Sequence, residues 1–107
     1  MKKIFLFVAA AVMVSLAPAS AMAADDAQGT WDKMCAKCHG KTGAGDTKMG
    51  QKMKVHDYTK ADFQAKYTDD ELFKVIKEGK EDMPAYGKKL TDDQIKEQVK
   101  LIRSFKK

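Results

Sequence analysis

Both cysteines of the chain and one of its two histidines lie within the five residues Cys35-Ala36-Lys37-Cys38-His39. Two thiols at this spacing on a helical turn can form thioethers with the two vinyl groups on neighbouring edges of a haem. The histidine that follows is then placed to bind the iron from one side. The motif therefore predicts one covalently attached haem c, with Cys35 and Cys38 as the attachment residues and His39 as an iron ligand.

Two other kinds of site also use paired cysteines. A C-x-x-C thiol–disulfide pair is permitted in an oxidising compartment, but it normally belongs to a strand–helix–strand unit, for which this sequence gives no signal. A closed zinc site needs four ligands. Outside the motif, the sequence offers only His56 as a further candidate ligand. Both alternatives stay open at this point, and the spacing favours haem.

A haem iron bound by one histidine needs a sixth ligand, or it keeps an open position for a gas or a peroxide. Met34 lies beside the motif and cannot reach the other face of a haem, and His56 has the setting of a solvent-facing loop histidine. Met83 is the preferred ligand because the following Pro84 keeps it extended, in a loop between two predicted helices. The alternatives that remain follow the glycine-rich stretch and are Met49 and Met53.

The first 23 residues have the layout of a secretory signal peptide. Lys2 and Lys3 precede an apolar run from Ile4 to Ala17, and Ala21-Met22-Ala23 supplies the small residues of a cleavage site. The apolar run is about 14 residues long, whereas a membrane-spanning helix needs roughly 20, which disfavours an uncleaved membrane anchor. We therefore predict a cleaved signal peptide at 1–23, a mature domain at 24–107 and a periplasmic location.

The mature domain is small and weakly basic. Removing 23 of the 107 residues leaves 84, and a domain of this size often needs a cofactor or another staple to complete its core. Loss of Lys2 and Lys3 lowers the formal charge from +5 to +3. This charge is compatible with acidic partners and gives no argument for nucleic acid.

The elements that must position the motif are helices. Residues 24–39 show apolar side chains on one helical face, and four glycines between 40 and 57 favour turns with at most a short helix. A further short helix is predicted within 58–66. Thr68 with Glu71, and Thr91 with Gln94, are capping-box pairs that begin two more helices, and Gly79 ends the first of them. The fold class is all-α, with three to five short helices.

Taken together, these segments resemble the small class I c-type cytochromes, and the resemblance covers essentially the whole predicted mature chain. The matching residues are Trp31, Cys35 to Gly40, Gly43-Ala44-Gly45-Asp46, Met83-Pro84-Ala85-Tyr86 and Leu101-Ile102-Arg103-Ser104-Phe105.

The resemblance implies a class I cytochrome c fold in which His39 is the proximal ligand and Met83 the distal one. It also implies that the first and last helices cross at right angles, with Trp31 near Leu101 and Ile102. Many members carry a proline whose carbonyl orients the proximal histidine, and this chain has none between the two ligands. A carbonyl in the loop 43–50 is the expected substitute.

Ligation by His39 and Met83 saturates the iron and leaves no position for a substrate. The expected function is therefore single-electron transfer by Fe(II)/Fe(III) cycling in a soluble monomer, and not catalysis. The expected partners are a reductase and an oxidase or another cytochrome, which dock transiently through small interfaces. The rival function is a haem sensor or peroxidase-like enzyme with an open sixth position.

Overall fold

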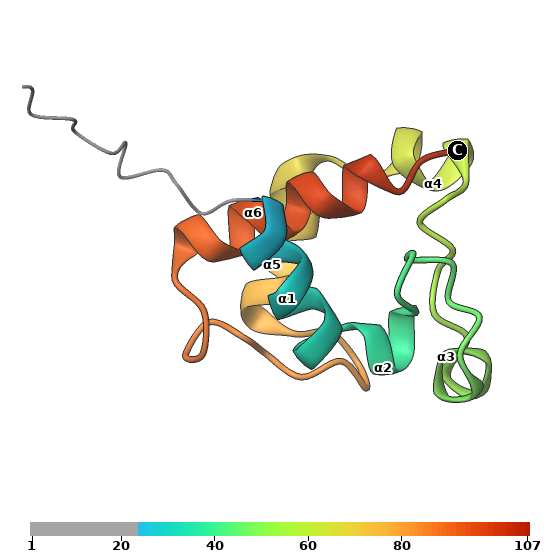
Figure 1. Cartoon of the computed structure of the whole chain (residues 1–107), viewed down its shortest axis with the longest axis horizontal. Helices are drawn as coiled ribbons and strands as arrows, with labels where there is room; N and C mark the ends of the chain where they lie inside the picture. The colour runs from blue at the N-terminus through green and yellow to red at the C-terminus, as the bar shows by residue number, and fades with distance from the viewer. Residues whose placement is uncertain (1–23) are drawn as a thin grey trace, which may run out of the picture.

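The computed structural model describes residues 24–107, and the predicted signal peptide lies outside the described residues. Six helices follow one another along the described chain (Figure 1): α1 (Ala24–Met34), α2 (Ala36–His39), α3 (Lys48–Met53), α4 (Ala61–Lys66), α5 (Asp69–Glu78) and α6 (Asp92–Ser104). The part of the chain described here contains no strand, only an isolated bridge between Lys80 and Met83. The predicted all-α class is confirmed.

The helix count exceeds the predicted three to five because the first predicted helix divides at Cys35. Its backbone N–H still donates to the Trp31 carbonyl at 2.8 Å, and the His39 N–H donates to the Cys35 carbonyl at 3.0 Å. The Cys38 N–H, however, donates to Cys35 at 3.3 Å, one residue short of the regular α-helical partner. Gly40, with φ of 81°, ends α2.

The two predicted capping boxes are both present. Thr68 accepts a hydrogen bond from the Glu71 N–H at the start of α5, and the Glu71 side chain accepts one from the Thr68 N–H. Thr91 and Gln94 make the same pair at the start of α6. Gly79 follows α5 with φ of 77°, as expected for a residue that ends a helix.

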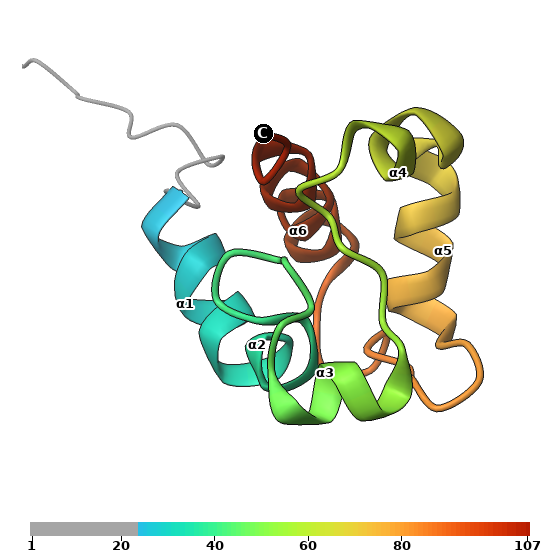
Figure 2. The same cartoon turned by 90° about the vertical axis from the view of Figure 1, so that its right-hand side faces the viewer.

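The core lies where α1 and α5 pack against α6 (Figures 1 and 2). Trp31 of α1 and Ile95 and Ile102 of α6 are at most 2% exposed and belong to one apolar cluster. This confirms the expected packing of Trp31 near the last helix. Gln98 is also buried in α6, and its amide donates to the Ala27 carbonyl at 3.0 Å, which ties the two helices together.

The turn between α4 and α5 is fastened to the end of α6 by Arg103. Its guanidinium donates to the carbonyls of Gln64 at 2.9 Å and Tyr67 at 2.5 Å, and to the Asp69 carboxylate at 2.8 Å. These contacts join segments more than thirty residues apart in sequence. Among the helices of residues 24–107, none is both long and apolar enough to cross a bilayer.

Candidate haem-binding site

A cavity of about 280 Å³ lies between the attachment motif and the loops on either side of it. One part of its wall is formed by Cys35, Cys38 and His39, and residues 53–56 with Tyr58 form another. The third part comes from the Met83 loop, defined here as residues 79–90, through residues 80–84 and Tyr86. Segments far apart in sequence therefore meet around the predicted attachment residues.

The backbone of the attachment motif is fixed by neighbouring residues. The Trp31 indole donates to the Gly40 carbonyl at 2.8 Å, and the Thr47 hydroxyl donates to the Cys38 carbonyl at 2.9 Å. Gly50 of α3 lies so close to this carbonyl that a Cβ atom there would overlap it. The sequence indicated a short helix near residues 49–55, but it gave no sign that this helix holds the motif in place.

The two cysteines are half-buried free thiols in the structure. Burial, with a smaller contribution from the neighbouring Cys38, raises the pKa of the Cys35 thiol to about 11. A nucleophilic cysteine of a thiol–disulfide enzyme needs the opposite shift, toward a lower pKa. Cys35 therefore lacks the lowered pKa of such a nucleophile.

His39 lines the same cavity in its neutral form. Burial, followed by the charge of His56, lowers the pKa of His39 to about 4. A neutral imidazole is the form that binds a metal. Its ring stacks on Tyr58, with ring centres 5.0 Å apart and planes inclined by 19°, and Trp31 lies 5.7 Å away.

The expected carbonyl partner of His39 is not present in the described structure. The Nδ1 atom of His39 is buried and has no hydrogen-bond partner among residues 24–107. The backbone of the loop 43–50 makes other hydrogen bonds instead. The Gly43 carbonyl accepts from the Tyr58 N–H, and the Gly45 N–H donates to the His39 carbonyl. Stacking on Tyr58 holds the ring here, a contact that only the folded chain reveals.

The structure places four of the five candidate sixth ligands on the cavity wall: Met34, Met53, His56 and Met83. Met49 does not line it. His56 is exposed, as expected, but its side chain also borders the cavity. Met83 differs from the others in its backbone, since it exchanges two hydrogen bonds with Lys80, at 2.9 and 3.1 Å. The Met83 loop is thereby held in a tight turn.

The donors gathered at the cavity fit a covalently bound haem. Two thiols, a neutral imidazole and thioether sulfurs face a space bordered by Val75 and the rings of Tyr58 and Tyr86. A bare metal ion would require a different set of ligands. No group of three or more histidine, cysteine, aspartate or glutamate side chains placed to hold one occurs within residues 24–107, which disfavours the zinc alternative.

Tyr58 and Tyr86 are the site residues that sequence reasoning missed. In the sequence, Tyr86 stands out only as part of the Met-Pro-Ala-Tyr segment, and Tyr58 belongs to no motif. Their signal is weak because a tyrosine in a loop is compatible with many environments. Only the meeting of distant segments shows that both rings border the cavity.

Comparison with known proteins gives consistent matches along the chain. Residues 22–102 match the family model described as cytochrome C oxidase, cbb3-type, subunit III. Cytochrome c6 of Thermosynechococcus vestitus is 37% identical over 102 residues, which covers 91% of this chain and 87% of that protein. Cytochrome c6 of Thermostichus vulcanus matches with the same identity and coverage.

Solved structures agree with these sequence matches. The KustC0563 c-type cytochrome superposes with a TM-score of 0.72 at 30% identity, covering 76% of this chain and 98% of that one. A mutant form of that cytochrome gives a TM-score of 0.69 at 29% identity, covering 76% of this chain and 99% of its own. Sequence, fold and donor set thus lead to one conclusion: the chain belongs to the c-type cytochromes, as a small class I, haem c-binding electron-transfer protein.

Proposed function

We propose that this chain is an exported electron carrier that converts no substrate, in which Cys35 and Cys38 would hold the haem through thioethers and His39 and Met83 would bind its iron. The haem, when bound, supplies one-electron exchange between Fe(II) and Fe(III). The protein contributes the cavity and, on separate segments of its wall, the four residues that would hold the haem. If His39 and Met83 both bound the iron, they would leave no coordination site for a substrate, a gas or a peroxide.

The observation that carries this proposal is the placement of the Met83 thioether in a hydrogen-bonded turn on the cavity that His39 also lines. A ligand already held in place loses little conformational freedom when it binds the iron. Met53, by comparison, is 43% exposed. A thioether ligand also favours the ferrous state, which raises the reduction potential relative to two imidazoles.

Residues 1–23 act, in this proposal, as a signal peptide cleaved after Ala23, which delivers a monomeric domain of residues 24–107 to the periplasm. The layout of charged, apolar and small residues supports this assignment. Covalent attachment suits such a location, because a haem held by two thioethers cannot diffuse away from an exported protein.

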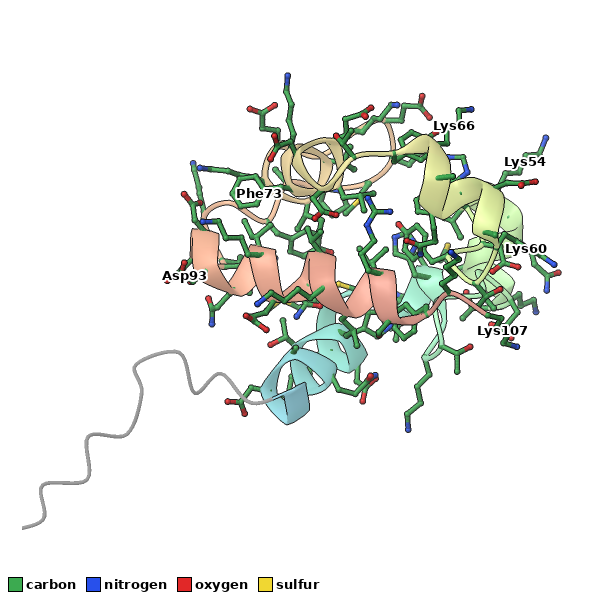
Figure 3. All side chains as sticks on the ribbon, turned by 90° about the horizontal axis from the view of Figure 1, so that it is seen from above. Lys54, Lys60, Lys66, Phe73, Asp93 and Lys107 are labelled. Atoms are coloured by element: carbon green, nitrogen blue, oxygen red, sulfur yellow. The ribbon has the colours of Figure 1, made fainter. Side chains whose placement is uncertain are left out.

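The partners in this proposal are redox proteins, namely a reductase and an oxidase or another cytochrome, that present an acidic surface. Lys54, Lys60, Lys66 and Lys107 lie at the same end of the molecule, and Asp93 lies at the other (Figure 3). The four lysines are exposed and form no salt bridge with the described residues. Lys54 borders the haem cavity, so a partner attracted to this end would approach the cofactor.

Absorption spectroscopy of the haem-loaded protein tests the ligand set. The wild type should show a sharp reduced α band and a weak far-red band when oxidised. The far-red band should vanish in Met83→Ala and persist in Met53→Ala, the matched control on the same cavity. The mass of the purified protein should equal residues 24–107 plus one haem.

Other outcomes would point elsewhere. Loss of the far-red band in Met53→Ala alone would move the sixth ligand to Met53. Rapid, complete binding of carbon monoxide by the reduced wild type at neutral pH would favour the sensor or peroxidase function. A colourless protein, from a host able to attach haem, would contradict haem binding itself.

A further inference from the structure

Tyr86 connects the Met83 loop to the residue that precedes the attachment motif. Its hydroxyl donates to the backbone carbonyl of Met34 at 3.1 Å, across 52 residues of sequence. Met34 immediately precedes Cys35, so the acceptor lies at the edge of the attachment motif. In the described chain, this is the one hydrogen bond between the Met83 loop and residues 24–60.

The Met34 carbonyl is available because the first helix divides at Cys35. In a regular helix, the Cys38 N–H would donate to Met34, but here it donates to the Cys35 carbonyl at 3.3 Å. A helix-terminal carbonyl that loses its backbone partner needs another donor. The Tyr86 hydroxyl supplies that donor from a loop 52 residues later in the sequence.

Tyr86 is itself firmly connected to the segment that carries Met83. Its N–H donates to the Ile76 carbonyl at 2.9 Å, and the next residue, Gly87, donates to Lys77 at 3.0 Å. Met83 lies three residues earlier, paired with Lys80. Only two residues separate Met83 from Tyr86, and Met83 and Tyr86 are both hydrogen-bonded through their backbones. A displacement of Tyr86 should therefore also displace Met83.

We propose that the Tyr86 hydroxyl is a positioning group for the distal ligand, which keeps Met83 at the distance from the attachment motif that the iron requires. This inference rests on the ligand set proposed above. Without the hydroxyl, the Met34 carbonyl is left unpartnered, and the hydrogen bonds that still join the Met83 loop to other described residues go to α5 alone. The state in which Met83 has left the iron then becomes more populated, while the overall fold persists.

Imidazole binding to the oxidised, haem-loaded protein measures this opening, since imidazole competes with Met83 for the iron. Its apparent affinity scales with the fraction of molecules in which Met83 is displaced. Loss of one hydrogen bond of ordinary strength should raise that affinity about three- to tenfold in Tyr86→Phe. Tyr67→Phe is the matched control, because the Tyr67 hydroxyl makes no hydrogen bond in residues 24–107 and Tyr67 does not border the cavity.

Hydrogen exchange gives a second, local measurement. The Met83 N–H, which donates to Lys80, should exchange faster in Tyr86→Phe and at the wild-type rate in Tyr67→Phe. An unchanged imidazole affinity and exchange rate in Tyr86→Phe would overturn the proposal. A lower unfolding midpoint without a change in imidazole affinity would also overturn it, since the hydroxyl would then be purely structural.

Failure of the underlying ligand set has a different signature. If Met83→Ala keeps the far-red band, Met83 is not the ligand, and the positioning role toward iron falls with it whatever Tyr86→Phe does. If Met83→Ala loses the band but Tyr86→Phe binds imidazole as the wild type does, the ligand set stands and only the role of Tyr86 is refuted.

Discussion

Replacing Thr47 by valine should destabilise the protein more than removal of an ordinary helix cap. The Thr47 hydroxyl makes two hydrogen bonds, accepting from the Gly50 N–H at 2.9 Å and donating to the Cys38 carbonyl at 2.9 Å. Loss of an N-cap costs about 1 kcal/mol. Leaving the Cys38 carbonyl without its donor adds about 1 kcal/mol. Valine keeps the branched shape, so the expected loss is about 2 kcal/mol.

Guanidinium unfolding of the haem-loaded protein provides the assay. With a slope of about 3 kcal/mol per molar denaturant, a loss of about 2 kcal/mol lowers the midpoint by about 0.7 M. Thr91→Val is the matched control because Thr91 caps α6 but donates to no carbonyl of the motif, so it should lose about half as much. Equal losses in the two variants would refute the idea that Thr47 secures the attachment motif, and Thr47→Ser should recover most of the stability.

Two further predictions concern the core and the dependence on pH. Trp31→Phe should lower the free energy of unfolding by about 2 kcal/mol or more, because it leaves a cavity and removes the donor to the Gly40 carbonyl; a change under about 0.5 kcal/mol in denaturant unfolding would contradict this. Hydrogen bonds from Thr68 hold the pKa of Glu71 below its ordinary 4.5, so this carboxylate contributes stability above that pH and loses it as the pH falls through the lowered pKa. The midpoint temperature of thermal unfolding should therefore fall less steeply from about pH 6 to about pH 3 for Glu71→Gln than for the wild type. Parallel curves for the two proteins would refute this contribution of Glu71.

The helices and the attachment residues could be predicted from the sequence because their signals are local. Each capping-box pair marks a helix start within four residues and makes the predicted hydrogen bonds: Thr68 with Glu71, and Thr91 with Gln94. The cysteine motif is likewise contained in five residues. In each case the physical interaction and the sequence pattern have the same short range.

Other features could not be predicted because they join residues that are distant in sequence and belong to no motif. Arg103 meets the turn after α4 across 36 residues, and Gln98 reaches Ala27 across 71. No local pattern in the sequence marks such pairs. The same reason explains why we expect a carbonyl of the loop 43–50 beside His39, whereas the described ring stacks on Tyr58 from the following segment.

The packing of the first helix against the last has a consequence for how the chain folds. Trp31 is covered by residues of α6, more than sixty positions later, so the core cannot close until the final helix has been synthesised. Contacts of such long sequence separation carry a large loop-closure entropy and form slowly. A chain that ends before Asp92 lacks Ile95, Val99 and Ile102, leaving Trp31 exposed. The cysteine motif, by contrast, is complete early in synthesis. It remains accessible until α6 packs over the nearby Trp31.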